Sequence, residues 1–196
     1  MSHTVIGLVG GIASGKSTVA ALFGALRPGV CVDADAIAHR VVQRPQIQEA
    51  IRNRLPGSIG RDGAVDRRKL ADLVFSKMSA LKTLEEITHP PIRRAVKTAI
   101  RRAVGTVYLD APLLLETGAS ELCDWVVYVA CPARVRRRRA RERGWTETEH
   151  AQREARQWPL RKKRAHADFL IDNSGDLART RKDVRRVLRR LEKSGA

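Results

Sequence analysis

The sequence predicts an α/β fold in which a five-stranded parallel sheet carries helices on both faces. Short apolar runs alternate with longer segments of helical periodicity, as in sheets built from strand–helix–strand units. The first run passes into the glycine-rich stretch GLVGGIASGKSTVA at 7–20, and acidic residues follow the next two runs. The carboxyl ends of parallel strands meet at one edge, where ligands bind. These observations indicate the three-layer fold of P-loop NTPases, with a helical substrate-binding insertion and a lid.

The glycine-rich stretch has the spacing of a phosphate-binding loop. Gly10, Gly15, Lys16 and Ser17 fit the pattern G-x-x-x-x-G-K-[ST]. An apolar run precedes them, and apolar residues at helical spacing follow over 17–26. Backbone N–H groups of such a loop and the start of its helix attract phosphate. We expect Lys16 to reach the β- and γ-phosphates of a nucleoside triphosphate, and the Ser17 hydroxyl to bind Mg²⁺.

A second strand is predicted at 30–32, and two acids follow it within DADAIAHRVV. Asp33 can cap the next helix or take part in the chemistry. Asp35 can accept a proton from a hydroxyl substrate or favour the positive end of the helix dipole. The residues alone leave these alternatives open.

Residues 34–103 are predicted to form an inserted helical subdomain, because the stretch is too long for an ordinary crossover. We expect breaks in its helices at LPGSIGRDG (55–63) and THPP (88–91). Asp66 is the predicted N-cap of one helix. His89 either ends a helix before the prolines or contacts substrate.

Three further strands are predicted at 106–110, 125–130 and 169–171. Asp110, which ends the first of them, can hold a metal-bound water or cap the turn at Pro112. A last helix is predicted at 176–192, with apolar residues toward the sheet: Leu177, Val184, Leu188 and Leu191.

The arginine-rich residues 134–164 are predicted to form a lid, and at least half of the arginines of 134–143 are expected to face solvent. A lid of this kind excludes water from the transferred phosphoryl group. The nucleotide-binding core then consists of the remaining parts of the chain, residues 1–33, 104–133 and 165–196.

The net charge is +17, with 43% hydrophobic and 4% aromatic residues. The charge fits polyanionic substrates, a nucleic-acid partner or a solvated basic surface. Few aromatic side chains are available for base stacking, so we expect no specific nucleic-acid partner. The sequence shows neither a membrane span nor a signal segment, which favours a cytoplasmic monomer or weak homo-oligomer. Neither the cysteines nor the histidines have metal-ligand spacing; we expect small buried residues at Cys31, Cys123 and Cys131, and surface or core residues at His39, His150 and His166.

Five segments in order resemble the dephospho-CoA kinase family, from residue 5 to about 192. They are the loop, then DADAIAHRVV (33–42), HPPI (89–92), DAPLLLETG (110–118) and ADFLIDNSG (167–175). The resemblance implies a kinase that uses ATP and Mg²⁺. It implies transfer of the γ-phosphoryl group to the 3′-hydroxyl of dephospho-CoA, giving coenzyme A and ADP.

The resemblance also implies roles for individual residues. Asp35 matches the base near the ribose hydroxyl, and His89 lies in a substrate segment. Arg139 and Arg143 match basic lid residues, and Asn173 lies where the chain passes the adenine. The nucleotide loop matches Gly11, Ile12, Ala13, Ser14, Gly15, Lys16, Ser17 and Thr18.

The sequence departs from the family pattern at several points. Ala13 replaces the third glycine of the usual G-G-I-G-S-G-K-S, so we expect residue 13 not to need a positive φ. Arg136 stands where a glutamine is usual, and the loop around Gly144 is one residue shorter. Because of this uncertain register, either Arg138 or Arg139 can correspond to the basic lid residue of the family.

Two other functions fit the loop. Another small-molecule kinase, such as a nucleoside monophosphate kinase, predicts the same Lys16 chemistry with a different acceptor. A nucleic-acid-binding NTPase predicts binding that weakens steeply with salt.

Overall fold

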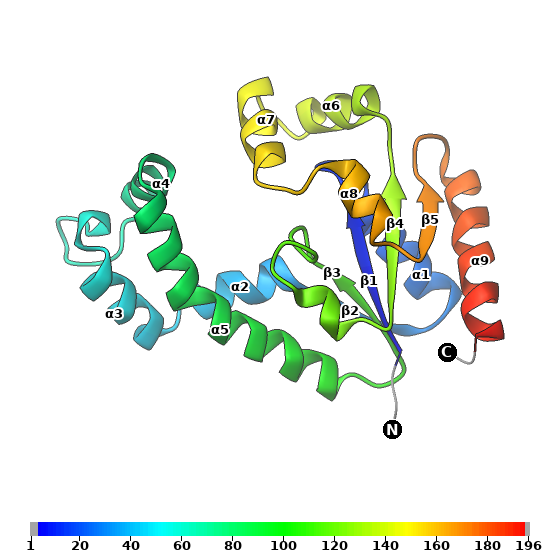
Figure 1. Ribbon diagram of the computed structural model, residues 1–196, viewed down its shortest axis with the longest axis horizontal. Helices are drawn as coiled ribbons and strands as arrows, with labels where there is room; N and C mark the ends of the chain where they lie inside the picture. Colours follow the sequence, from blue (N-terminus) through cyan, green and yellow to red (C-terminus); the bar gives the residue numbers. More distant parts are fainter. Residues whose placement is uncertain (1–3, 195–196) are drawn as a thin grey trace. The chain divides into compact units, whose positions relative to one another are not determined.

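The computed structural model describes residues 4–194 and confirms the predicted sheet (Figure 1). Over these residues all five strands are parallel, in the order β2-β3-β1-β4-β5. The third and fourth strands have the predicted bounds, the fifth is one residue longer at its end, and the first and second, expected at 4–9 and 30–32, differ by one residue at each end. The strands are β1 Val5–Gly10, β2 Gly29–Asp33, β3 Thr106–Asp110, β4 Trp125–Ala130 and β5 Phe169–Asp172.

The α-helices in the described part of the chain are α1 Lys16–Leu26, α2 Ala34–Val42, α3 Pro45–Arg54, α4 Arg67–Ser76, α5 Met78–Arg102, α6 Ala133–Glu142, α7 Glu147–Ala155, α8 Leu160–Ala165 and α9 Leu177–Lys193. Short 3₁₀ turns lie at Pro56–Ser58 and Ala119–Leu122. Figure 1 shows α6 beyond the carboxyl end of β4, with α7 following it along the chain.

One face of the sheet is covered by α1 and α9, and their apolar side chains form the main core with β1, β3, β4 and β5. Phe23 of α1 stacks on Tyr108 of β3 with ring centroids 5.3 Å apart. The other face is covered by α8 and the segment after β3. A Cβ added to Gly7 would lie 2.6 Å from both Leu114 and Cys123, so the absent side chain lets that segment pack directly on β1.

The chain folds as two compact units. The first contains the residues up to 33 and those from 99 onward, so it holds the sheet and the helices α6 to α8. The second spans residues 34–98 and contains α2, α3, α4 and most of α5. Within it Asp66 caps α4 as predicted, because its carboxylate accepts from the N–H groups of Arg68 at 2.8 Å and Lys69 at 3.1 Å.

The predicted break at THPP is wrong. α5 runs without interruption from Met78 to Arg102, with Pro90 and Pro91 inside it and His89 exposed at its middle. Proline fixes φ near −65°, which is a helical value, but each ring also lacks an N–H donor and crowds the carbonyl four residues before it. The turns on either side complete the helix. The break at 55–63 is confirmed, since a 3₁₀ turn and an isolated bridge from Ile59 to Val65 lie there.

Two expectations about burial are also wrong. Leu177 is 53% exposed and does not face the core, because it is the first residue of α9 and lies at the carboxyl edge of the sheet. Cys31 is exposed, since it belongs to the edge strand β2, while Cys123 and Cys131 are half-buried. Among the described residues, no helix combines the length and the apolar character needed to cross a membrane.

Candidate active site

The glycine-rich loop joins β1 to α1 through a tight turn. The N–H of Ser14 donates to the carbonyl of Gly11 at 3.2 Å, and Gly15 is the N-cap of α1 with φ +88°. Ala13 has φ +58°, so the expectation that residue 13 avoids positive φ is wrong. It is the third residue of the Gly11–Ser14 turn, a position that takes a positive φ in type II turns and usually a glycine.

Side chains from other elements bind two carbonyl groups of this loop. The Ser14 carbonyl accepts from Nδ2 of Asn173 at 2.8 Å and from Nη1 of Arg139 at 3.2 Å. The Ile12 carbonyl accepts from Nη1 of Arg136 at 3.3 Å. The first N–H groups of an α-helix have no carbonyl of a preceding turn to bind, and α1 has no acid in its first turn. The loop and the helix start therefore favour an anion.

A cavity of about 380 Å³ opens beside the loop. It brings together five of the predicted site residues: the nucleotide-binding residues Gly15, Thr18, Arg143 and Asn173, and the catalytic lid residue Arg139. Its wall also contains residues that the sequence analysis did not assign to the site: Glu142, Gly175 and Leu177. The signal for Leu177 was present, since an apolar residue directly after the helix cap Asp176 lies at the open end of its helix.

Asn173 supports the loop with its side chain. Nδ2 donates to the Ser14 carbonyl, while Oδ1 accepts from the Thr180 hydroxyl at 3.1 Å. The residue is 4% exposed. Both ends of the amide are therefore bound within the protein, although the residue still forms part of the cavity wall beside Gly15.

Arg139 and Arg138 differ in what they contact. Nη1 of Arg139 donates to the Ser14 carbonyl, and Nη2 donates to the Asn173 carbonyl at 3.0 Å. Arg138 pairs with Glu142 at 3.5 Å on the helix surface, where its side chain is 66% exposed. Of the two candidates left open by the lid register, Arg139 is the one at the loop.

The loop-side ends of β4 and β5 carry a thiol and a carboxylate with shifted pKa values. Burial raises the pKa of the Cys131 thiol, although Arg139 beside it acts in the opposite direction. Nη1 of Arg139 lies 3.6 Å from that sulfur. Hydrogen bonds from Ser174 lower the pKa of Asp172, which also pairs with Arg179 at 3.1 Å.

The acids predicted for catalysis lie in different units. Asp33 ends β2 and is the register neighbour of Asp110 in β3, which is in turn the register neighbour of Leu8 in β1. Asp35 is exposed in the first turn of α2, and His89 is exposed on α5; both belong to the second unit. Among the described residues, no group of three or more His, Cys, Asp or Glu side chains could hold a metal ion.

A buried ion pair between α8 and the segment after β3 was missed by the sequence analysis. Lys163 of α8 is 1% exposed, and its ammonium group lies 2.9 Å from the Glu116 carboxylate. It also donates to the Pro112 carbonyl at 3.2 Å and to Gln157 at 3.0 Å. The pair joins α8 to the segment after β3. The sequence feature that could have predicted this pair is Glu116, an acid that directly follows the apolar run of DAPLLLETG.

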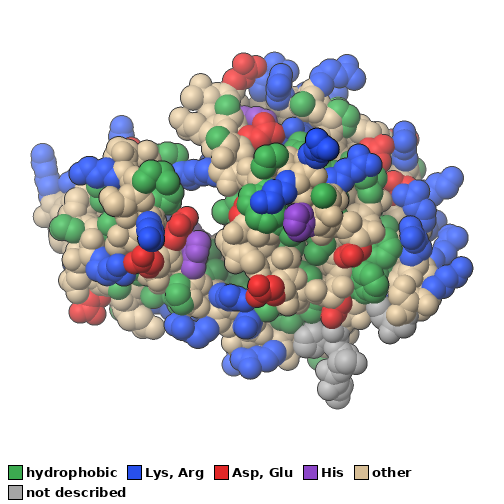
Figure 2. Space-filling model, viewed as in Figure 1, with side chains coloured by type: hydrophobic (Ala, Val, Ile, Leu, Met, Phe, Trp, Pro, Cys, Tyr) green, Lys and Arg blue, Asp and Glu red, His purple; other side chains and the backbone are tan. Residues whose placement is uncertain are grey.

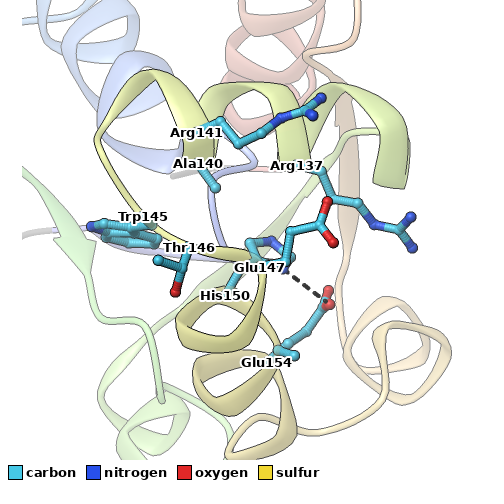
Figure 3. Close-up of a pocket in the computed structure, with 9 residues that line it drawn as sticks. Arg137, Ala140, Arg141, Trp145, Thr146, Glu147, His150 and Glu154 are labelled. Carbon is cyan, nitrogen blue, oxygen red and sulfur yellow. Dashed lines mark ion pairs between the residues drawn. The ribbon is translucent and has the colours of Figure 1, made fainter.

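A second cavity, of about 250 Å³, is lined by residues of α6 and α7 (Figure 3). His150 and Glu154 lie on α7, where Nδ1 of His150 is 3.7 Å from the Glu154 carboxylate. Arg137 and Arg141 come from α6, and Figure 3 shows Arg137 pointing away from His150.

Comparison with known proteins gives a consistent set of relatives. The family model of dephospho-CoA kinase matches residues 4–179. The dephospho-CoA kinase of Aquifex aeolicus is 36% identical over 190 residues, covering 95% of this chain and 96% of that protein. The dephospho-CoA kinase of Bdellovibrio bacteriovorus is 40% identical over 194 residues, covering 95% and 96%.

Two solved structures resemble the fold of this chain. The crystal structure of TT1252 from Thermus thermophilus has a TM-score of 0.86 and 35% identity, covering 97% of this chain and 99% of that chain. Shikimate kinase from Acinetobacter baumannii has a TM-score of 0.56 and 16% identity, covering 98% and 95%, so that likeness extends to the fold alone.

Proposed function

The chain belongs to the dephospho-CoA kinase family and phosphorylates dephospho-CoA to coenzyme A; from that premise we propose that its glycine-rich loop holds the phosphates of ATP. The observation that carries the proposal is the cavity in which Gly15 and Thr18 of the loop meet Arg139 and Arg143. Phosphoryl transfer depends mainly on positioning and on neutralising charge. Lys16 and Arg139 supply positive charge from two different elements.

The nucleoside of ATP would extend from the phosphates along the remaining wall of this cavity. Leu177 is 53% exposed there and offers an apolar contact for a base. Gly175 beside it has no side chain to obstruct a ring. Asn173 would act on the nucleotide indirectly, by holding the Ser14 carbonyl.

Mg²⁺ would be held by the Ser17 hydroxyl, which is exposed in the first turn of α1. Asp110 is the candidate to hold a water of the ion, because its strand is the register neighbour of β1. Hydroxyl and carboxylate oxygens are ligands that Mg²⁺ accepts. When bound, the ion neutralises charge on the phosphates.

Asp35 is proposed to orient the 3′-hydroxyl of dephospho-CoA and take its proton. It is exposed, and it follows Asp33 at the end of β2 by two residues. The second unit, residues 34–98, would bind the acceptor, with His89 among its contacts. The helices α6 to α8 would act as the lid.

Removal of the Lys16 ammonium group tests the proposal. Lys16→Ala should abolish coenzyme A formation, because the loop loses the cation that reaches the transferred group. The melting temperature should stay within about 2 °C of the wild type, a shift that corresponds to less than about 1 kcal/mol for a chain of this size. A variant that melts far lower would show instead that Lys16 stabilises the fold. Activity retained in a folded Lys16→Ala protein would overturn the proposal.

A further inference from the structure

Arg136 is a buried arginine of α6 whose guanidinium group packs against the phosphate loop. Its side chain is 5% exposed, Nη1 donates to the Ile12 carbonyl, and Nε donates to the Cys131 carbonyl at 3.2 Å. A Cβ added to Gly11 would lie 2.9 Å from Nη1, so the contact leaves no spare room. A buried charge is costly unless it is paired and hydrogen-bonded. Arg136 meets this condition through three separate segments of the chain.

The loop contains a backbone conformation that alanine rarely adopts. The hydrogen bond from Ser14 to Gly11 closes a four-residue turn, with Ile12 and Ala13 at its centre. Ala13 has φ +58°, and among the described residues other than glycine it alone has a positive φ. Such a residue persists only where its surroundings determine the conformation.

The peptide group between Ile12 and Ala13 decides which turn forms. Type I and type II turns differ mainly in the orientation of the peptide plane that joins the two central residues, and only type II gives the third residue a positive φ. The carbonyl of that plane is the Ile12 carbonyl, which accepts from Arg136.

We propose that Arg136 is a positioning residue that holds the Ile12–Ala13 peptide in the orientation that gives Ala13 its positive φ. The hydrogen bond thereby keeps the loop in the shape that receives the phosphates. The inference rests on the proposed role of this loop in binding ATP. It accounts for an alanine at a position that glycine would occupy without steric cost.

Glu154 of α7 also binds the guanidinium group of Arg136, at the same nitrogen that donates to the Ile12 carbonyl. Its carboxylate pairs with Nη1 of Arg136, and its second oxygen faces His150 (Figure 3). α7 begins at a capping box, in which Thr146 and Glu149 each bind the backbone of the other. The loop is therefore supported from α7 through two side chains, Glu154 and Arg136.

A double-variant cycle at Ala13 and Arg136 tests the proposal. The dissociation constant of ATP, measured without acceptor, should change less than about threefold in Ala13→Gly and rise about tenfold in Arg136→Gln, a loss within the range that contacting residues show. The combined variant should return to within about threefold of the wild type, because glycine holds the turn without the hydrogen bond. The matched control Arg138→Gln removes an exposed arginine of the same helix and should change binding less than about twofold.

The kinetics give a second readout. At saturating ATP and dephospho-CoA, kcat of Arg136→Gln should stay within about threefold of the wild type, because Arg136 acts on ATP affinity through the loop backbone. A melting-temperature scan separates loss of the loop shape from loss of the fold.

Losses that multiply in the combined variant, with no rescue by glycine, would overturn the proposal. So would a combined variant that fails to fold where Ala13→Gly folds, because Arg136 would then serve the packing of α6. A different result would show that the loop does not bind ATP at all. In that case the single variant Lys16→Ala would leave the affinity for ATP unchanged.

Discussion

At the scale of single residues, Asp33 and Asp35 are separated by one position and belong to different elements. Asp33 ends β2 and has Asp110 as its register neighbour, whereas Asp35 lies in the first turn of α2. Two carboxylates on neighbouring strands repel each other when both are ionised. Asp33 is therefore placed to shape the charge of the sheet edge, and Asp35 is the candidate base.

The exchange of each acid for its amide separates these roles. Asp35→Asn should lower kcat by 10²–10⁴-fold, the usual loss on removing a general base, with little change in the ATP dissociation constant. Asp33→Asn should be milder, because the amide keeps the size and the hydrogen-bonding capacity. Both constants are measured with dephospho-CoA saturating. If Asp35→Asn retains more than about a tenth of the wild-type kcat, Asp35 is not the general base. A large loss of kcat in Asp33→Asn would then show that Asp33 has that role.

Arg139 and Arg138 form a natural pair of test and control. Arg139→Ala should lower kcat by about 10²-fold or more while weakening ATP binding less, because a lid cation acts most strongly as charge develops on the transferred group. Arg138→Ala removes only an exposed pair with Glu142 and should leave both constants within about twofold. An equal loss of ATP affinity with kcat intact would contradict the role assigned to Arg139.

At the scale of secondary-structure elements, the two prolines inside α5 were the least predictable feature. Pro90 is exposed and Pro91 is buried, and the helix continues through both. Proline in a helix interior lacks an N–H donor and is unfavourable by about 3 kcal/mol relative to alanine. Proline at a first helical position carries no such penalty, and Pro45 has that position in α3.

Replacing Pro90 inside α5 and Pro45 at the start of α3 by alanine should therefore have opposite effects on stability. Pro90→Ala should raise the free energy of unfolding by about 1–2 kcal/mol, since the restored N–H donor outweighs the greater entropy of the unfolded chain. Pro45→Ala should lower it by about 0.4–1 kcal/mol. Thermal unfolding of the two variants measures both shifts. A destabilised Pro90→Ala would mean that the helix requires the bend or the packing of the proline ring.

The strands, most of the helices and the nucleotide loop could be predicted from local sequence patterns. The side-chain contacts that support the loop could not. Buried parallel strands are apolar runs bounded by turns, so β3 and β4 were predicted to the residue. The contact from Arg136 to the Ile12 carbonyl joins residues 124 positions apart, and no spacing rule relates them. The positive φ of Ala13 is a product of that contact and of the turn. Spacing also does not show where a helix begins relative to the sheet. The helical pattern of residues 177, 184, 188 and 191 therefore assigned Leu177 to the core, although α9 begins beyond the end of the sheet.

At the scale of the whole molecule, the net charge of +17 affects stability. Figure 2 shows Lys and Arg side chains gathered along the edge that α9 occupies in Figure 1. Arg181, Arg185 and Arg189 of α9 are exposed and follow one another at four-residue spacing. Like charges at this spacing destabilise a helix by about 0.2–0.5 kcal/mol per pair, and a large net charge destabilises the compact state as a whole.

Salt should therefore stabilise this protein. The melting temperature should rise by several degrees between about 0.01 M and 0.3 M NaCl, because the Debye length falls from about 30 Å to below 10 Å. Arg185→Glu converts two repulsive neighbours into attractive ones and should raise the melting temperature at low salt by about 2–4 °C, equivalent to about 1 kcal/mol. Its dependence on salt should be smaller than that of the wild type.

Arg186→Glu is the matched control for this charge reversal. It reduces the net charge equally and, like Arg185→Glu, places an acid four residues from two basic ones, here Lys182 and Arg190. It differs in that it removes the pair with Asp183 at 3.1 Å and places two acids together. If net charge alone governs stability, both reversals raise the melting temperature alike. If the pairing with Asp183 also matters, Arg186→Glu melts at a clearly lower temperature than Arg185→Glu, and the structure favours this second outcome because the Asp183 side chain is only 15% exposed. A melting temperature that is insensitive to NaCl would show that repulsion among the surface arginines does not limit the stability of the fold.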